Sequence, residues 1–199
     1  MGRHGETEAT SKGMRIISAG YLRTVTQPAD RKTGDVPEVC FIGRSNVGKS
    51  SLINRLVMQK VARTSSTPGA TKAINLYEVS YDHGGTRRRC ILSDFPGFGY
   101  SKVSKTTYRG WEALVDGYIT GNRFIRRLVW VLDIRRDLDE LDETVFTWVQ
   151  DKGLSCTVVL TKSDKEGRGH NIMKKERVAA KLATSPVFTG LPVPAYTYR

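Results

Sequence analysis

The sequence is poor in several features that would place it in particular classes of protein. Only three of its 199 residues are cysteines, and the wide spacing of Cys40, Cys90 and Cys156 fits neither a zinc site nor a disulfide framework. We interpret them as buried thiols in a reducing compartment. No apolar run approaches the roughly 20 residues of a membrane helix, and residues 1–6 lack the apolar core of a signal peptide. We therefore expect a cytoplasmic protein with no membrane partner.

Acidic residues are scarce relative to basic ones. The chain has 32 Lys and Arg against 20 Asp and Glu, which gives a formal net charge of +12. Basic clusters occur at residues 87–89, at 123–127 and from 162 to 181. Such a surface favours a polyanionic partner, above all nucleic acid, and simple solubility would not require so large an imbalance. Because no RNA-recognition or helix-turn-helix signature is visible, we expect binding to RNA or a ribonucleoprotein without sequence readout of DNA.

One stretch, from Gly43 to Ser50, matches the phosphate-binding pattern G-x-x-x-x-G-K-[ST] at every fixed position. The apolar run 39–42 precedes it as a strand would, and apolar residues at helical spacing follow it up to Val57. Glycines in such a loop let backbone N–H groups and the helix N-terminus point at phosphates. Lys49 would then neutralise phosphate charge, and the Ser50 hydroxyl would bind Mg²⁺.

Two shorter motifs follow later in the chain. Residues 94–97 fit D-x-x-G, in which a carboxylate at the end of a strand holds Mg²⁺ through water and a glycine N–H reaches the γ-phosphate. Residues 161–164 fit [NT]-K-x-D. There Asp164 can accept two hydrogen bonds that guanine offers and adenine does not, and the stem of Lys162 can cover the base. All three motifs follow predicted strands, and ligands of parallel sheets bind beyond the carboxyl ends of strands.

The alternation of strand and helix patterns predicts an α/β fold. We expect residues 14–199 to form a single domain. Its sheet should be mostly parallel, with six or seven strands, helices on both faces and one antiparallel edge strand. A hairpin is predicted within residues 74–93, because two strand patterns flank His-Gly-Gly at 83–85. Residues 1–13 are polar and are predicted to be a disordered tail, and residues 61–73 are predicted to form a nucleotide-dependent switch loop.

The full set of motifs resembles the TRAFAC class of GTPases, and more closely the EngB family, also called YihA or YsxC. The residues that carry the resemblance are 43–54, 67–71, 94–100 with 102–105, and 161–164. Residues 16–19 and 131–135 fit the family too, and the match runs from about residue 15 to about residue 182. The resemblance implies a P-loop G domain that binds GTP and GDP with Mg²⁺. It also implies a role in assembly of the large ribosomal subunit, through its rRNA, and the family's association with cell division and septation. We expect a monomer.

The resemblance also assigns roles to single residues. Thr71 would be the switch threonine that completes the Mg²⁺ site with Ser50 and Asp94, and Asn46 matches relatives that hold K⁺. With Lys49 and Gly97, Thr71 and Asn46 make up the expected catalytic set. The residues expected to contact the nucleotide come from five segments. These residues are Gly43, Arg44, Ser45, Asn46, Val47, Gly48, Lys49, Ser50, Ser51, Gly69, Ala70, Thr71, Lys72, Ala73, Asp94, Phe95, Pro96, Gly97, Thr161, Lys162, Ser163, Asp164, Tyr196, Thr197 and Tyr198.

The carboxyl-terminal part departs from the family pattern. Relatives carry a Ser-rich or Ser-Ala guanine-contacting loop after the last strand, followed by a final helix. Here residues 193–199 match the strand, but the loop is reduced to residues 196–198 and the helix is missing. We therefore expect one face of the sheet to be partly bare, with weakened affinity for guanine nucleotides or weakened stability.

Phe98 follows the D-x-x-G motif at the position where Ras-like enzymes place a water-orienting glutamine. A phenyl ring cannot hydrogen-bond water, so we predict slow intrinsic hydrolysis that a partner stimulates. Two functions stay open at this point: a GTPase switch, and an RNA-binding assembly factor that uses the nucleotide for stability with little turnover. A small-molecule kinase is disfavoured, because no lid or acceptor site is apparent.

Overall fold

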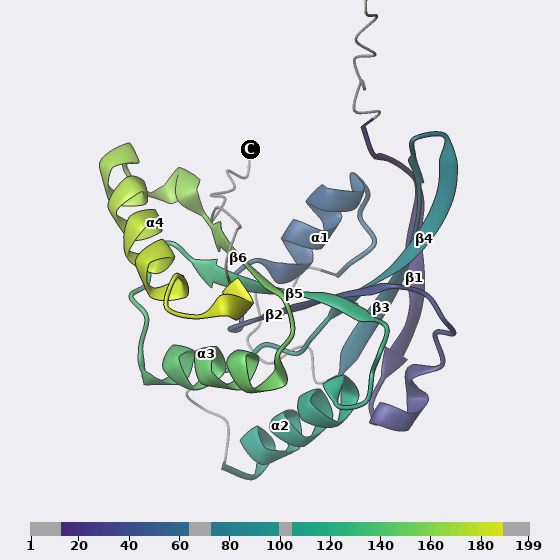
Figure 1. Cartoon of the computed structure of the whole chain (residues 1–199), viewed down its shortest axis with the longest axis horizontal. Helices are drawn as coiled ribbons and strands as arrows, with labels where there is room; N and C mark the ends of the chain where they lie inside the picture. The colour runs from purple at the N-terminus through teal and green to yellow at the C-terminus, as the bar shows by residue number, and fades with distance from the viewer. Residues whose placement is uncertain (1–12, 64–72, 100–104, 189–199) are drawn as a thin grey trace, which may run out of the picture.

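The computed structural model describes residues 13–63, 73–99 and 105–188 (Figure 1). In this part of the chain six strands form one sheet, and four α-helices pack against it. The strands are β1 (Arg15–Val25), β2 (Glu38–Gly43), β3 (Ile74–His83), β4 (Thr86–Asp94), β5 (Ile125–Asp133) and β6 (Cys156–Thr161). The helices are α1 (Lys49–Val57), α2 (Lys105–Ile119), α3 (Glu140–Lys152) and α4 (Arg168–Leu182), with short 3₁₀ turns η1 (Pro28–Arg31), η2 (Ser163–Lys165) and η3 (Pro186–Phe188).

The sheet is mixed and mostly parallel, as predicted. Its strand order is β1-β3-β4-β2-β5-β6. Strand β2 runs parallel to β4 and β5, and β5 runs parallel to β6, whereas β3 is antiparallel to both β1 and β4. The antiparallel strand therefore lies second from the edge rather than at the edge. The reason is that β1, an 11-residue strand, pairs along the outer side of β3 and so forms the edge itself.

Helices cover both faces of the sheet, which confirms the prediction (Figure 1). Strand β5 shows how: Leu128 and Trp130 point into one apolar cluster with α2, α3 and α4, while Val131 points into a second cluster with α1. Strands buried on both faces read as continuous apolar runs, and β5 does so. In the described part α1 is the one α-helix on its face, and Val39 and Val129 are half-buried there. The expectation that the final helix is missing concerns residues 189–199, which lie outside the described part of the chain.

A buried carboxylate ties four elements together at the end of the sheet where β2 begins. The Glu38 side chain is fully buried. It accepts hydrogen bonds from Ser93 of β4 at 2.5 Å, from Tyr118 of α2 at 2.6 Å and from Asn122 at 3.2 Å, and it pairs with Arg31 of η1 at 3.3 Å. Burial, and then the charge of Glu38, raise the pKa of Tyr118. A buried charge is tolerated when it is paired and fully hydrogen-bonded, so this hub fixes the end of α2 against the sheet.

The cysteines are free thiols, in agreement with the sequence interpretation. Cys40 and Cys156 are buried and Cys90 is half-buried. Burial raises the pKa of Cys90 to about 11 and that of Cys156 to about 12, so both thiols are protonated at neutral pH. Within the described residues, none of the helices has the length and apolarity to cross a bilayer.

Candidate nucleotide-binding site

The loop between β2 and α1 has a backbone that its sequence makes possible. Gly43 has φ 152°, and a Cβ atom there would lie 2.4 Å from the carbonyl oxygen of Val131 on β5. Gly48 has φ 101° and stands at the N-cap of α1. No other residue type fits the first position, and few adopt the second. The loop therefore stays close to the sheet and presents the N-terminus of α1 at the sheet edge, as an anion site requires.

Lys49 is the buried cation of this loop. It is 8% exposed, and its Nζ donates to the carbonyl oxygens of Gly43 and Arg44 at 3.1 Å each. Burial lowers the pKa of Lys49, and the charge of Asp94 opposes that shift. An ammonium group held in a low dielectric interacts strongly with any further negative charge. Lys49 is thus placed to neutralise a phosphate.

Asp94 and Ser50, the two described residues that the sequence predicts as Mg²⁺ ligands, lie in contact with each other. The Ser50 hydroxyl donates to Asp94 Oδ2 at 2.7 Å, across from α1 to the end of β4. Asp94 Oδ1 is buried and has no hydrogen-bond partner within the described part of the chain. Burial raises the pKa of Asp94, while Lys49 and the Ser50 hydrogen bond lower it. An unsatisfied carboxylate oxygen beside a hydroxyl is a donor set that Mg²⁺ prefers, so the residues present fit this cation.

The D-x-x-G segment lies directly against the phosphate loop. A Cβ atom on Gly97 would lie 2.7 Å from the backbone nitrogen and Cα of Ser45. The Ser45 N–H donates to the Phe98 carbonyl at 3.1 Å, and the Phe98 N–H donates to the Gly43 carbonyl at 3.4 Å. The side chains of Phe95 and Phe98 are both buried in the apolar core. The Phe98 ring is therefore a packing group, and it is not directed at water.

The T-K-x-D segment contacts the other side of the phosphate loop. Thr161 Oγ1 lies 2.5 Å from the Val47 carbonyl oxygen and 3.0 Å from that of Leu132. Lys162 has φ 61°, and its Nζ donates to the Asn46 carbonyl at 2.6 Å. These contacts join the end of β6 to the loop after β2, although the two segments lie more than a hundred residues apart. The phosphate and guanine motifs therefore form one continuous surface.

Asp164 stands at the outer end of this surface. It lies in η2, its side chain is 22% exposed, and Lys165 Nζ lies 3.3 Å from its Oδ2. The backbone that carries it is fixed, because Asn171 of α4 donates to the Ser163 carbonyl at 2.8 Å. The Lys165 side chain is 63% exposed, so Asp164 can exchange this ion pair for hydrogen bonds to a ligand at little cost, because pairs with a solvent-exposed partner contribute little.

Sequence reasoning missed Asp133 and Arg135 as site residues. Asp133 ends β5, accepts from Arg135 Nε at 2.9 Å and Nη2 at 2.7 Å, and pairs with Lys162 at 3.0 Å. Burial alone would raise the pKa of Asp133, but these partners outweigh it and bring the pKa to about 2. A signal for these two residues exists, because β5 lies between β2 and β6 in the sheet and ends at the same carboxyl edge as both of them.

A pocket of about 310 Å³ lies at this edge. Its lining residues are Ser45, Asn46, Val47, Asp133, Arg135, Arg136 and Lys162.

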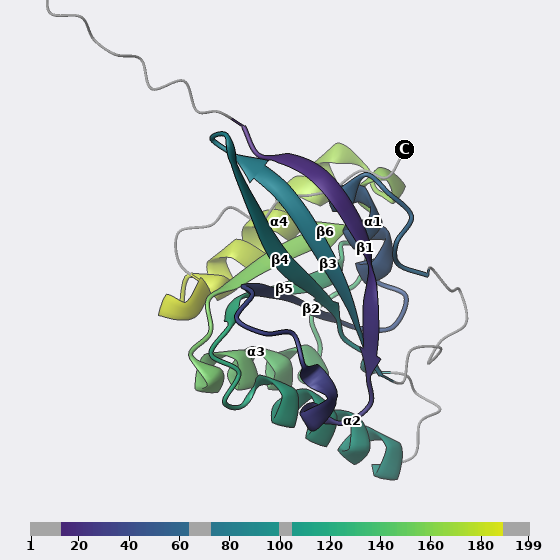
Figure 2. The same cartoon turned by 90° about the vertical axis from the view of Figure 1, so that its right-hand side faces the viewer.

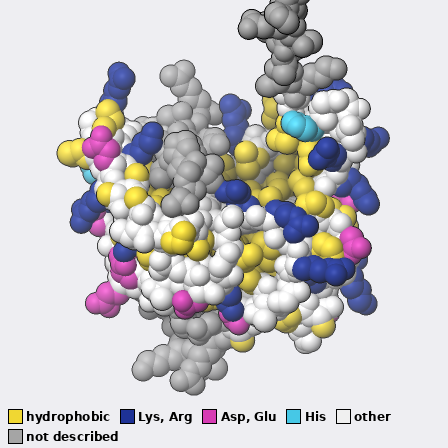
Figure 3. Space-filling view, in the orientation of Figure 1, with side chains coloured by type: hydrophobic (Ala, Val, Ile, Leu, Met, Phe, Trp, Pro, Cys, Tyr) yellow, Lys and Arg dark blue, Asp and Glu magenta, His cyan; other side chains and the backbone are white. Residues whose placement is uncertain are grey.

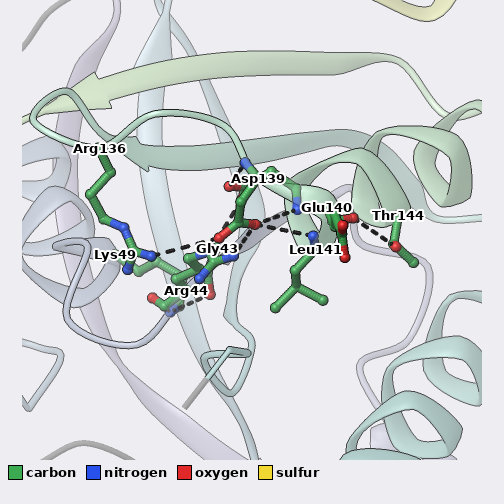
Figure 4. Close-up of polar contacts among 9 residues, drawn as sticks. Gly43, Arg44, Lys49, Arg136, Asp139, Glu140, Leu141 and Thr144 are labelled. Atoms are coloured by element: carbon green, nitrogen blue, oxygen red, sulfur yellow. Dashed lines mark hydrogen bonds and ion pairs between the residues drawn. The ribbon is translucent and has the colours of Figure 1, made fainter. Parts of the chain in front are cut away.

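A second missed feature is the contact of Arg44 with α3 (Figure 4). Arg44 is buried, and its guanidinium pairs with Asp139 and, at 3.3 Å, with Asp142. Asp139 is the N-cap of α3 and also accepts from the backbone N–H of Leu141 at 3.0 Å. Burial raises the pKa of Asp142, and Arg44 lowers it. One guanidinium thus joins the phosphate loop to the start of α3.

The remaining predicted site residues divide into those the structure describes and those it does not. Ser51 lies in α1, and Ala73 immediately precedes β3. Pro96, in the D-x-x-G segment, is buried. The predicted residues that lie outside the described part are Gly69, Ala70, Thr71, Lys72, Tyr196, Thr197 and Tyr198.

Because phosphate, magnesium and guanine motifs meet at the carboxyl edge of a mixed α/β sheet, the protein is a P-loop GTPase by fold and site. The family model described as "50S ribosome-binding GTPase" matches residues 38–162. The chain is also 38% identical over 171 residues to "Probable GTP-binding protein EngB" of Syntrophus aciditrophicus (strain SB), over 85% of this chain and 84% of that protein. The chain belongs to the EngB family of GTP-binding proteins.

Solved structures support the fold at lower identity. One is Era "in complex with MgGDPNP and nucleotides 1506-1542 of 16S ribosomal RNA", with a TM-score of 0.61 and 22% identity over 80% of this chain and 51% of that chain. Another is Toc33 from Arabidopsis thaliana "in complex with Mg2+ and GMPPNP", with a TM-score of 0.54 and 24% identity over 78% of this chain and 64% of that chain.

The Arg44 contacts generate a prediction about stability and its pH dependence. Arg44→Met removes the cation but leaves the two carboxylates, so we expect the free energy of unfolding at pH 7.5 to fall by about 3 kcal/mol. Because Asp142 has a raised pKa that the substitution raises further, the loss should shrink as the pH falls toward 5 and that carboxylate protonates. Urea denaturation at both pH values measures this.

Arg136→Met is the matched control, because Arg136 is half-exposed and pairs with Asp139 at 3.8 Å. It should cost no more than about 0.5 kcal/mol at either pH. Equal losses for the two variants, or a loss from Arg44→Met that grows toward pH 5, would contradict the role given to Arg44.

Proposed function

We propose that the protein is a Mg²⁺-dependent GTPase switch that acts in assembly of the large ribosomal subunit. The observation that carries this proposal is that the phosphate loop contacts both Gly97 and Lys162, so that one nucleotide can reach all three motifs. Membership of the EngB family and the ribosome-binding description of the matching model support it. The family association with cell division and septation, a cytoplasmic location and a monomeric state belong to the same proposal.

The proposed reaction is GTP + H₂O → GDP + phosphate. Lys49 and the backbone N–H groups of the phosphate loop would neutralise charge on the β- and γ-phosphates. Ser50 and Asp94, together with Thr71, would hold Mg²⁺, which supplies further charge neutralisation when bound. The Gly97 N–H would reach the γ-phosphate. Because the Phe98 ring is buried in the core, no side chain at that position orients water, and slow intrinsic turnover is expected.

Guanine recognition is proposed for the other end of the site. Asp164 would accept from the two donors on the guanine edge, and the stem of Lys162 would cover the base. Lys162 is held between Asp133 and the Asn46 carbonyl, which fixes its stem at the mouth of the pocket. Residues 196–198 are proposed as a further contact to the base, and residues 61–73 as the nucleotide-dependent switch loop, within which residues 69–73 would contact the nucleotide.

The proposal of a ribosomal partner rests on the net charge of the chain and on what its relatives bind. The net charge of +12 favours an RNA partner. The Era structure, which shares this fold, combines MgGDPNP with a fragment of ribosomal RNA. The same observations suit a second function, an RNA-binding assembly factor that hydrolyses little GTP. Phosphate release with and without purified large ribosomal subunits separates the two: a switch is stimulated, and an assembly factor of the second kind is not.

Asp164→Asn should weaken GDP binding by about 100-fold or more, because it replaces an acceptor with a donor opposite the guanine N–H groups. The variant should gain affinity for xanthosine diphosphate, whose base carries an oxygen at that edge. Calorimetric titration with GDP, ADP and xanthosine diphosphate measures both changes. Lys165→Gln, which removes only the neighbouring surface charge, should bind GDP as the unmodified protein does, and an Asp164→Asn variant that also does so would refute the assignment.

Asn46 generates a prediction about monovalent cations. If a K⁺ ion bound beside Asn46 supplies positive charge to the phosphates, as an arginine finger does in other GTPases, turnover should be faster in K⁺ than in Na⁺ at equal ionic strength. Asn46→Ala should abolish the difference while GDP still binds. Phosphate-release assays in the two salts test this, and equal rates for the unmodified protein would remove K⁺ from the proposal.

A further inference from the structure

Two basic clusters that are far apart in the sequence lie at the same end of the sheet. Strand β4 begins at Thr86 and β5 begins at Ile125, and both run parallel to β2, whose far end carries the phosphate loop. Residues 87–89 and 123–127 therefore lie at the amino-terminal end of the parallel strands, opposite the nucleotide site. Figure 2 shows β1, β3 and β4 side by side, with the β3–β4 hairpin projecting past β2.

Most of these arginines have no acidic partner in the part of the chain that the structure describes. Arg87 and Arg88 are exposed, and neither side chain makes an ion pair or hydrogen bond with a described residue. Arg126 is exposed and donates to the carbonyl of Arg123. Arg89 is the exception, because it pairs with Glu78 at 3.0 Å. We call Arg87, Arg88, Arg123 and Arg126 the arginine edge.

The third basic cluster, from residue 162 to residue 181, differs in its charge balance. Several of its lysines and arginines face acids, and these ion pairs are Lys162 with Asp133, Lys165 with Asp164, Lys174 and Arg177 with Asp137, and Lys181 with Glu143. Figure 3 agrees with this contrast: Asp and Glu side chains gather over α3, while Lys and Arg predominate on the side formed by β1, β3 and β4. Ion pairing therefore neutralises several cations of the third cluster, whereas the exposed arginines at the start of β4 are mostly left without an acidic partner among the described residues.

The turn that carries Arg123 and Arg126 is fixed before any partner arrives. The Glu38 N–H donates to the Phe124 carbonyl at 2.9 Å, and Asn122 donates to the Glu38 carboxylate. The Phe124 ring faces the guanidinium groups of Arg31 at 5.1 Å and Arg123 at 5.0 Å. A partner that binds here does not have to order the turn, which lowers the entropic cost of association.

The chemistry of the edge selects the phosphate backbone of RNA. Guanidinium groups match phosphate oxygens through two parallel hydrogen bonds. The Phe124 ring is occupied by arginines, so it is not available to stack on a base. Without base stacking or base-edge contacts, recognition depends on backbone charge and shape, which is how proteins bind double-stranded RNA. An acidic protein surface is the competing partner, and comparing binding to an RNA duplex with binding to ribosomal subunits separates the two.

We infer that the arginine edge binds the phosphate backbone of folded RNA. This inference rests on the proposed function in so far as the RNA in the cell is that of the large ribosomal subunit. It places the RNA-binding surface and the nucleotide site at opposite ends of the sheet. Glu38 contacts both Tyr118 of α2 and Asn122 of the arginine-bearing turn, so the helix that follows the Asp94 loop ends at this surface.

The test uses the full chain with Arg88→Gln combined with Arg126→Gln. The control combines Arg168→Gln with Lys175→Gln, two exposed residues of α4, and changes the net charge equally. The probe is a short RNA duplex of arbitrary sequence, titrated by fluorescence anisotropy over a range of KCl concentrations. We expect the slope of log K against log salt to become shallower by about two for the first variant, because each substitution removes one phosphate interaction, and to stay unchanged for the control. GDP binding by both variants should stay unchanged, which shows that they fold.

Co-sedimentation with purified large ribosomal subunits completes the design. If the unmodified protein binds subunits and the Arg88/Arg126 variant binds subunits and duplex equally well, the arginine edge is wrong while the proposed function stands. If the unmodified protein does not bind subunits, the proposed function fails, and the salt slopes measured with the duplex alone decide whether the arginine edge binds RNA. If the Arg88/Arg126 variant loses subunit binding while its duplex slope is unchanged, the partner of the arginine edge is an acidic protein and the inference of RNA binding is overturned. If the Arg168/Lys175 control loses binding equally, the effect is one of net charge, and the inference is overturned as well.

Discussion

The structure depends on the fixed position of one loop, residues 43–50, among its neighbours. The Val131 carbonyl approaches it from β5, and Thr161 and Lys162 hold its carbonyl groups from the end of β6. Arg44 ties it to the N-cap of α3. The contacts from β6, and the close approach of Gly97 to Ser45, also bring the guanine and magnesium motifs within reach of one ligand. Preorganised N–H groups of this kind interact with phosphate without a further cost for their own ordering.

Charges that are costly to bury surround this loop. Lys49 and Asp94 are both buried, and burial shifts both pKa values toward the neutral forms. Asp94 also keeps one carboxylate oxygen without a partner in the described part of the chain. Such a site is a local weakness of the unliganded fold, and native proteins tolerate it where a ligand supplies the missing charge. A magnesium-bound nucleotide supplies negative charge for Lys49 and a cation for Asp94.

The sequence was sufficient for the fold class and for the three motifs, because each motif is local and follows a strand whose apolar run is clear. It was not sufficient for Arg44, Asp133 or Arg135, whose roles come from contacts between strands and helices that are distant in sequence. The edge position of β1 was also missed. Its burial alternates only partly, and it pairs with β3 through two register shifts. Because β1 occupies the edge, the antiparallel strand β3 lies second from it.

The two ends of the sheet have different proposed tasks. The carboxyl end gathers the groups that suit a guanine nucleotide, and the amino-terminal end gathers exposed arginines that suit RNA. Helix α2 follows the Asp94 loop in the sequence, and Tyr118 near its end donates to Glu38, so the carboxyl end of α2 is anchored at the end of the sheet that carries the arginine edge.

The central claim is that three separated loops enclose one magnesium-bound guanine nucleotide. The most direct measurement is calorimetric titration of the unmodified protein with GTP, GDP and ATP, in Mg²⁺ and again with the metal chelated. We expect guanine nucleotides to bind at least about 100-fold more tightly than ATP, and GTP affinity to fall when Mg²⁺ is removed. Equal affinity for ATP and GTP, or no binding of GTP and GDP in the presence of Mg²⁺, would contradict the claim.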